Sequence, residues 1–175
     1  MARIDDFRSV LTGGGARGSQ FRVVLDFPRW VDFGDSVYRG VFLVKAAALP
    51  ASTISPIEVP YRGRVTKIAG ERQFSNWVVT ILNDNDFLIR NAMEQWSAGI
   101  LNHTATNGRL KSLDYQTDMV VEQLDRNESV IKSYKMHNCH PQNISEIGLD
   151  FGNTNSIEEY QVEFSVDYWT TAGLV

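Results

Sequence analysis

The stretch KAAALPASTISPIEVPYRGRVTKIAGERQFSNWVVTILND, from Lys45 to Asp84, decides the fold class of this chain. In its second half, apolar and polar residues alternate as they do in β-strands. The residues from Tyr61 to Lys67 lead to a turn at Gly70, and a second alternating run follows from Arg72 to Leu82. This alternation predicts a mainly β fold.

The first half of the same stretch predicts a long loop from Ala46 to Pro60. Three prolines, Pro50, Pro56 and Pro60, stiffen this loop and remove backbone donors that sheet pairing would need. A long connection without secondary structure is usually functional or mobile. We therefore expect the loop to project and dock on a neighbouring molecule, the alternative being a passive surface loop.

The strand predicted after Arg72 is apolar on both of its faces. One face carries Phe74, Val78 and Leu82, and the other carries Trp77, Val79 and Ile81. A wall strand of a solitary domain should show one polar face. Two apolar faces indicate burial on both sides, either by the core or by a partner subunit.

Other runs along the chain also predict strands. Phe21 to Phe27 alternates, and Val41 to Lys45 is apolar at almost every position, as in a strand covered on both sides. Asp118 to Asp125 and Ser129 to His137 predict two strands joined by a turn. The cleanest alternation runs from Tyr160 to Tyr168.

The two strands joined by a turn have mixed faces. Glu122 lies between Val120 and Leu124 on one face of the first strand, and Lys132 interrupts the second strand in the same way. We interpret this pattern as strands that leave the core partway and continue into a wall between subunits.

Two segments predict helices. Ile4, Phe7 and Leu11 recur at helical spacing, and the glycine-rich run from Gly13 to Gly18 then acts as a flexible joint. A longer amphipathic helix is expected from about Asp86 to Leu101, after capping residues. Its apolar stripe consists of Ile89, Ala92, Met93, Trp96 and Ile100.

Length and composition favour one domain, residues 1–175, with enough apolar residues for a real core. The net charge of −4 argues against a protein that grips nucleic-acid phosphates, although nucleic acid could slide past such a surface. The charged N-terminus does not resemble a signal peptide, and no run is long enough for a membrane helix. We expect a soluble protein made in the cytosol that does not enter membranes.

Candidate chemical sites are few. His137, Cys139 and His140 lie close together, but zinc would need further ligands and only His103 remains. Nucleophilic catalysis would need a positioned base and an orienting group, for which the chain has few combinations. The pairs Asp5-Asp6 and Glu158-Glu159, and the run Asn83 to Asp86, are better explained as solvated surface and a helix cap. We expect no enzyme activity, no cofactor and no metal. A small hydrolase, a metal enzyme or a ligand-binding β-module remain distant alternatives.

Three motifs carry a resemblance to a known family. They are KAAALPA (Lys45 to Ala51), VPYRGRVTKIAGERQFSNWVVTILND (Val59 to Asp84) and the C-terminal strand ending in DYW (Asp167 to Trp169). In this order and spacing they resemble the tail tube proteins of T4-like contractile-tailed bacteriophages. With the segments between them, the resemblance covers nearly the whole chain.

The resemblance implies a β-sandwich or barrel of two packed antiparallel sheets with one flanking α-helix and long loops. It implies hexameric rings whose strands join into a continuous barrel, and rings that stack into a hollow tube. DNA would pass through the lumen without sequence-specific binding. The tail sheath, the baseplate and the tail terminator proteins would be partners, and the protein would lie in the virion tail.

The resemblance also implies where the assembly contacts lie. The loop 46–60 would reach the adjacent ring, together with the N-terminal helix and flexible arm, residues 1–18. Expected inter-ring residues are Ala48, Leu49, Pro50, Ile54, Pro56 and Pro60. Expected residues of the wall strands are Tyr61, Arg64, Arg72, Phe74, Trp77, Glu122 and Lys132. The helix 86–101 would lie outside, towards the sheath, with Arg90 and Glu94 on its outer face.

Small departures and related assemblies leave alternatives open. The chain has an extra segment around Asp26 to Asp35 and continues past DYW with TTAGLV. The inner tube of a phage-derived contractile injection device, a tailocin or an extracellular system, would share the fold and the ring. A ring protein of type VI secretion is a more distant relation.

Overall fold

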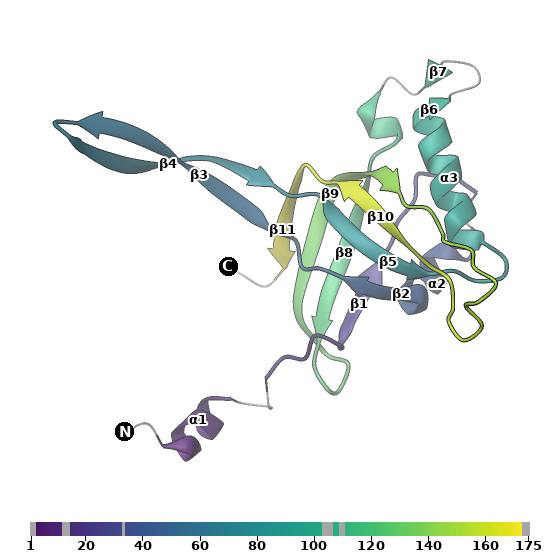
Figure 1. Ribbon diagram of the computed structural model, residues 1–175, viewed down its shortest axis with the longest axis horizontal. Coiled ribbons are helices and arrows are strands. Elements are labelled where there is room, and N and C mark those ends of the chain that lie inside the picture. The colour runs from purple at the N-terminus through teal and green to yellow at the C-terminus, as the bar shows by residue number, and fades with distance from the viewer. Residues whose placement is uncertain (1–2, 12–14, 33, 103–106, 109–110, 173–175) are drawn as a thin grey trace.

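The computed structural model describes residues 3–11, 15–32, 34–102, 107–108 and 111–172. It is mainly β, and two antiparallel sheets are joined through one long strand, β9 (Val130–Ile144) (Figure 1). The first sheet has the order β1 (Phe21–Val24), β8 (Thr117–Leu124), β9, β11 (Tyr168–Ala172). The second has the order β9, β10 (Glu159–Ser165), β5 (Trp77–Leu82), β2 (Val44–Ala47).

Strand β9 changes sheets at a bend near Asn138. Asn138 has a left-handed backbone (φ 57°), which asparagine tolerates better than most residues. The register between β8 and β9 shifts between Thr117 and Met119, opposite this bend. Before it β9 pairs with β8 and β11, and after it β9 pairs with β10, apart from one further pair with β8 between Cys139 and Thr117.

The core lies between the two sheets and the helix α3 (Leu88–Ile100). The alternation predicted from Tyr160 to Tyr168 is confirmed through Val166, because Tyr160, Val162, Phe164 and Val166 are all buried. The chain then turns into β11, and Tyr168 is exposed. Trp77, Val79 and Ile81 of β5 enter the same core.

Helix α3 confirms the predicted amphipathic helix. Ile89, Ala92, Met93 and Trp96 are buried, and Ile100 packs against the core. A side chain from the expected capping segment holds its first turn, since Asp84 Oδ1 accepts a hydrogen bond from the Leu88 N–H at 3.2 Å. The Trp96 ring lies 6.2 Å from that of Phe164, so the helix packs directly on the sheet containing β10.

The strand predicted from Val41 to Lys45 is wrong in its first half. Residues Ser36–Leu43 form a helix, α2, and only Val44 onward continues as β2. A short apolar run cannot distinguish a buried strand from a helix that packs on a sheet. Gly40 of α2 lies against the Leu25 side chain, where a Cβ would make an ordinary van der Waals contact of 3.4 Å with Cδ1.

The predicted loop 46–60 is also wrong over most of its length. Ser52–Tyr61 forms strand β3, paired with β4 (Arg64–Phe74) in a separate two-stranded ribbon. Proline is tolerated there because each strand of such a ribbon has one unpaired edge, and Pro56 also follows a register shift at Ile54. The turn lies at Arg62 and Gly63 (φ 46° and 78°) rather than at Gly70, which lies within β4.

The remaining elements are short. They comprise α1 (Ile4–Val10), the paired strands β6 (Leu101–Asn102) and β7 (Asn107–Gly108), and the 3-10 helix η2 (Ser112–Asp114). Gly13 and Gly14 of the predicted joint and His103 lie outside the described residues. None of the helices in the described ranges is long and apolar enough to cross a membrane.

Candidate assembly surfaces

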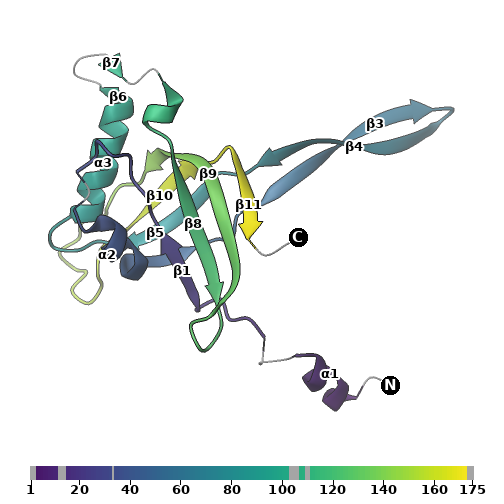
Figure 2. The same cartoon turned by 180° about the vertical axis from the view of Figure 1, so that it is seen from behind.

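The ribbon of β3 and β4, residues 52–74, projects far from the two sheets, and we call it the projecting hairpin (Figures 1 and 2). Nearly all of its side chains are exposed, including large apolar ones. Ile57 and Ile68 face each other across the ribbon, and each is 54% exposed. A monomer rarely exposes apolar residues in such continuity unless they meet a partner.

The two faces of the projecting hairpin differ in kind. Ile57, Val59 and Tyr61 share one face by the alternation of β3, so this face is mostly apolar. The other face carries an ion pair between Lys67 Nζ and Glu58 Oε1 at 3.4 Å. The hairpin therefore offers a partner one mostly apolar face and one face that carries charged side chains.

The projecting hairpin is basic in an otherwise acidic chain. It contains four basic residues and two acidic ones, so its net charge is +2, while the whole chain carries −4. The other residues therefore carry −6. Arg62 and Arg64 place two of these positive charges at the tip of the hairpin.

Two tryptophans fix the base of the projecting hairpin. The indole N–H of Trp77 donates to the Ala48 carbonyl at 2.7 Å, and that of Trp169 donates to the Ala51 carbonyl at 3.3 Å. The Phe74 ring packs edge-on against Trp169, with centroids 6.1 Å apart. The segment that enters the hairpin is thus held to both sheets, which sets the hairpin's direction.

The N-terminal helix is a second exposed apolar element. Ile4, Phe7 and Val10 of α1 are all exposed, and so is Leu11 after it. Figure 1 shows α1 standing clear of the sheets. The predicted amphipathic helix is confirmed, but its apolar side is not buried against the described part of the chain.

Sheet edges form a third surface. In the described residues, β1 and β11 lie at the edges of the first sheet and β2 lies at an edge of the second. Edge strands present backbone N–H and C=O groups that can pair with another chain.

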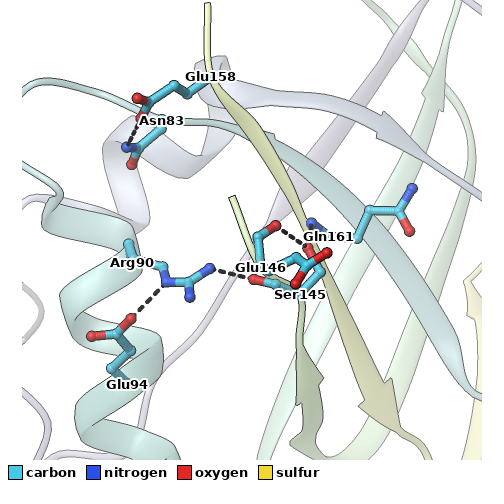
Figure 3. Close-up of polar contacts among 7 residues, drawn as sticks. All are labelled: Asn83, Arg90, Glu94, Ser145, Glu146, Glu158 and Gln161. Atoms are coloured by element: carbon cyan, nitrogen blue, oxygen red, sulfur yellow. Dashed lines mark hydrogen bonds and ion pairs between the residues drawn. The ribbon is translucent and has the colours of Figure 1, made fainter. Parts of the chain in front are cut away.

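The connection between β9 and β10, residues 145–158, is a fourth surface, and we call it the β9–β10 loop. Hydrogen bonds fasten both of its ends (Figure 3). At one end, the Ser145 carbonyl accepts from Arg90 Nη1 at 2.7 Å, and the Ser145 hydroxyl accepts from the Gln161 N–H at 2.8 Å. At the other end, Asn83 Nδ2 donates to Glu158 Oε2 at 3.0 Å.

We call the hydrogen bonds that hold the two ends of the β9–β10 loop the clamp. Arg90 is part of this clamp, contrary to its predicted place on the outer face of the helix. Its side chain is 17% exposed, and its guanidinium lies 4.9 Å from the centroid of the Tyr160 ring. Its Nε donates to Glu94 Oε1 at 2.6 Å, and Glu94 itself is exposed. Glu94 alone of this pair lies on the outer surface.

The residues predicted for the wall strands lie in different environments. Tyr61, Arg64 and Arg72 are exposed on the projecting hairpin, and Phe74 lies at its base. Trp77 is 2% exposed and lies in the core, which corrects its assignment as a contact with another subunit. The alternation showed that Trp77 and Val78 face opposite ways, but it did not show which side the core takes.

The two predicted wall residues in β8 and β9, Glu122 and Lys132, both have partners on the sheet. Arg22 Nε donates to Glu122 Oε2 at 2.8 Å, which ties β1 to β8. The Lys132 ammonium lies 5.1 Å from the centroid of the Tyr134 ring. Both residues are part-exposed, so their predicted role at a subunit seam stays a prediction.

Two of the candidate zinc residues, His137 and Cys139, lie at the bend of β9. His137 Nδ1 lies 3.2 Å from Asp118 Oδ2, and its Nε2 lies 3.0 Å from Thr170 Oγ1. Cys139 is buried, and burial raises the pKa of its thiol to about 12. Where the structure is described, no three His, Cys, Asp or Glu side chains gather in a way that could hold a metal ion.

Comparison with known proteins agrees with this architecture. A family model described as phage tail tube protein matches residues 16–172. Tail tube protein gp19 of Enterobacteria phage T4 is 30% identical over 170 residues, which cover 95% of this chain and 98% of the phage T4 protein.

Two solved structures from extracellular contractile injection systems share the fold. A sheath/tube terminator superposes with a TM-score of 0.66 at 11% identity, covering 90% of this chain and 96% of that one. A chain of a sheath-tube complex superposes with a TM-score of 0.63 at 10% identity, covering 95% and 97%. The family match over nearly all of the sequence, together with the phage T4 relative, shows that this chain belongs to the phage tail tube protein family.

Proposed function

We propose that this protein is the subunit of the inner tube of a contractile phage tail. Its copies form hexameric rings, and the rings stack into a hollow tube that conducts DNA during ejection. One observation carries the proposal beyond family membership: the fold exposes an apolar, basic hairpin whose base is held firmly to the sheets. Such a surface is costly for a monomer and useful for an assembly.

The ring contacts would come from the sheet edges. A heterologous contact, in which one edge of a copy meets a different edge of the next, closes into a ring when the rotation permits. Joining β1, β11 or β2 to a neighbour would satisfy their unpaired backbone groups and would also remove an aggregation hazard. The wall residues Glu122 and Lys132 belong to the first sheet and would lie near such seams.

The contacts between rings would come from the projecting hairpin and the N-terminal arm. The expected inter-ring residues from Ala48 to Pro60 lie at the base of the hairpin or along β3. Ile54 and Leu49 are exposed apolar residues in this region. On assembly, their burial would stabilise the stack by about 25 cal/mol for each Å² removed from water.

The sheath, the baseplate and the tail terminator are the proposed partners, and the location is the virion tail. Two neighbours by fold come from a sheath-tube complex and from a sheath/tube terminator, which is consistent with such partners. The exposed side of α3, which includes Glu94, would face the sheath. DNA would pass along the lumen without sequence-specific contacts, as suits an acidic chain.

The role is structural rather than catalytic. The inner tube of a phage-derived contractile injection device is the second candidate, since its fold and ring would be the same and its cargo would differ. Gene neighbourhood separates the two, because capsid and terminase genes beside this one would favour a phage.

Electron microscopy of the purified protein tests the proposal. We expect monomers, or slow polymerisation into rings and tubes at high concentration, and rapid extension when baseplates are added. A matched variant would replace residues 53–73 with a short turn and should not extend. A wild-type protein that stays monomeric at high concentration and also fails to extend on baseplates would contradict the proposal.

A further inference from the structure

The β9–β10 loop combines a fixed frame with an exposed apolar surface. Its ends are fastened to Arg90, Asn83 and β10, as described above. Between these ends, Leu149, Phe151 and Ile157 expose most of their side chains. A connection of this length that is anchored and apolar is usually functional.

A groove lies beside this loop. It has a volume of about 860 Å³ and lies between the loop and the neighbouring strands. Its lining includes Lys45, Leu82, Ile147, Phe151, Asp150 and Glu159. Apolar walls and carboxylates thus share one site.

The charge of this surface is opposite to that of the projecting hairpin. The β9–β10 loop contains three acidic residues and no basic one, which gives a net charge of −3, and Glu159 beside it is ion-paired with Lys45. The projecting hairpin carries +2, with Arg62 and Arg64 at its tip. Charge complementarity steers association and suppresses wrong partners.

The two surfaces lie at opposite ends of the molecule. The projecting hairpin leaves one side of the sheets, and the connection from β9 to β10 lies on the other side, in both views (Figures 1 and 2). The hairpin of one copy can therefore meet the loop only of another copy. A contact between unlike surfaces of identical chains also repeats indefinitely, as a growing tube requires.

We propose that the β9–β10 loop and its groove receive the tip of the projecting hairpin from a second copy of this chain. The proposal rests on the tube function and names the receptor for the hairpin within it. From opposite faces of the hairpin tip, Tyr61 and Val65 would meet Leu149 and Phe151, and the guanidinium groups of Arg62 and Arg64 would approach Asp150. Tyrosine and arginine, with tryptophan, are enriched among the residues that contribute most to the binding energy of an interface.

The N-terminal helix is the rival occupant of the groove. Its exposed side is also apolar, but Asp5 and Asp6 balance Arg3 and Arg8, so its charge does not complement the loop. The hairpin matches the groove in both apolar character and charge, and we therefore favour the hairpin.

Cross-linking between copies tests this contact in assembled tubes. Protein with Val65→Cys is mixed with protein carrying Phe151→Cys, and a short bismaleimide is added after assembly. We expect covalent dimers, to which the buried Cys139 does not contribute. The matched control replaces Phe151→Cys by Leu113→Cys, another strongly exposed apolar residue that lies outside the groove, and should yield few dimers.

Charge reversal gives an independent measurement. We expect Asp150→Lys to slow tube extension by about tenfold, and Arg62→Glu with Arg64→Glu to do the same. Extension should recover when Asp150→Lys subunits are mixed with those carrying the two glutamates, because half of the contacts then pair opposite charges again.

Each outcome bears on a different statement. Normal tubes without a cross-link between positions 65 and 151, or with an equal cross-link to position 113, overturn the proposed receptor and leave the tube function intact. A cross-link from Phe7→Cys to Phe151→Cys, in place of the hairpin, assigns the groove to the N-terminal helix and also overturns it. Wild-type protein that forms no rings or tubes contradicts the tube function itself.

Discussion

The projecting hairpin and the β5–β10 pair are both antiparallel ribbons with alternating apolar residues, yet their side chains meet opposite environments. Val162 and Phe164 of β10 are fully buried, and the Phe164 ring packs against Trp96 of α3. Ile57 and Ile68 of the hairpin are exposed to solvent at equivalent positions of their ribbon. Alternation therefore identifies a strand but does not show whether its own chain or another copy covers the apolar side.

This difference in burial indicates that the apolar residues of β10 stabilise the folded subunit, whereas those of the hairpin stabilise the assembly. A fully buried large apolar side chain stabilises a fold by about 1.5–3 kcal/mol relative to an exposed one. The residues of β10 contribute this free energy in the monomer. The residues of the hairpin contribute this free energy only when a partner covers them. Truncating them should therefore affect the stability of the monomer little and the stability of the tube strongly.

The largest effect is expected in the core. Phe164 packs between Trp77 and Trp96, with ring centroids 5.8 and 6.2 Å away. Phe164→Ala should lower the free energy of unfolding by about 3–5 kcal/mol, since it removes apolar contact and leaves a cavity. Urea denaturation of dilute, unassembled protein measures this. A loss below about 1 kcal/mol would show that this region is no more cohesive than the hairpin.

The core and α3 were the parts that sequence reasoning predicted well. The alternation from Tyr160 to Val166 and the helical stripe from Ile89 to Ile100 each follow a single period and place their apolar residues on one side, which packs in or against the core. In such segments local pattern and tertiary burial demand the same conformation.

The errors lie where local pattern fits two structures. The apolar run at Val41 suits either a strand or the last turn of α2, and a proline-rich segment suits either a loop or an edge strand. The projection of residues 46–60 was foreseen, but its pairing with β4 was not, because β-pairing is a nonlocal property.

The β9–β10 loop was not singled out from the sequence at all. Its signal was present as Leu149, Phe151 and Ile157 scattered through a run of glycine, asparagine and acidic residues. Sparse apolar residues in a polar loop are common, and only the fastened ends and the groove distinguish this one. Arg90 illustrates the same limit, because helical periodicity placed it outside while its length lets it reach back to Ser145.

The next largest effect on stability is expected at the clamp that holds the β9–β10 loop. Arg90→Ala should lower the free energy of unfolding by about 1–3 kcal/mol, because it leaves the Ser145 carbonyl without its charged donor and uncovers Tyr160. Hydrogen exchange of residues 146–157 should accelerate, while exchange in the projecting hairpin stays unchanged. Glu94→Ala is the matched control, since it removes one end of an exposed pair and should change little. Equal effects of both variants would contradict the clamp.

A smaller, pH-dependent effect is expected at the bend of β9. Burial opposes ionisation of Asp118, but hydrogen bonds from Lys135 and the Asn138 N–H and the nearby His137 outweigh it, so the pKa of Asp118 lies below its usual value of 3.8. A lowered pKa stabilises the fold above the unfolded pKa, and this stability is lost as pH falls through the folded value.

Asp118→Asn should therefore destabilise the protein at pH 7 by up to about 1 kcal/mol, a modest value because the pair with Lys135 is part-exposed. The difference from wild type should shrink as the pH is lowered below 4. Denaturation curves at several pH values measure it. A difference that is constant with pH would mean that Asp118 acts without its charge.

The smallest effect on folding, and the sharpest test of the comparison, is expected in the projecting hairpin. Ile57→Ala with Ile68→Ala removes a cross-strand pair that stabilises the ribbon by at most about 1 kcal/mol, and the sheets do not depend on it. Urea denaturation of the monomer should barely change, whereas tube extension on baseplates should fall severely. Val162→Ala is the matched control, because it should lower monomer stability in proportion to the methyl groups removed. If the hairpin variant unfolded as readily as the Val162 variant, or extended tubes at the wild-type rate, the division between residues that fold the subunit and residues that join subunits would not hold.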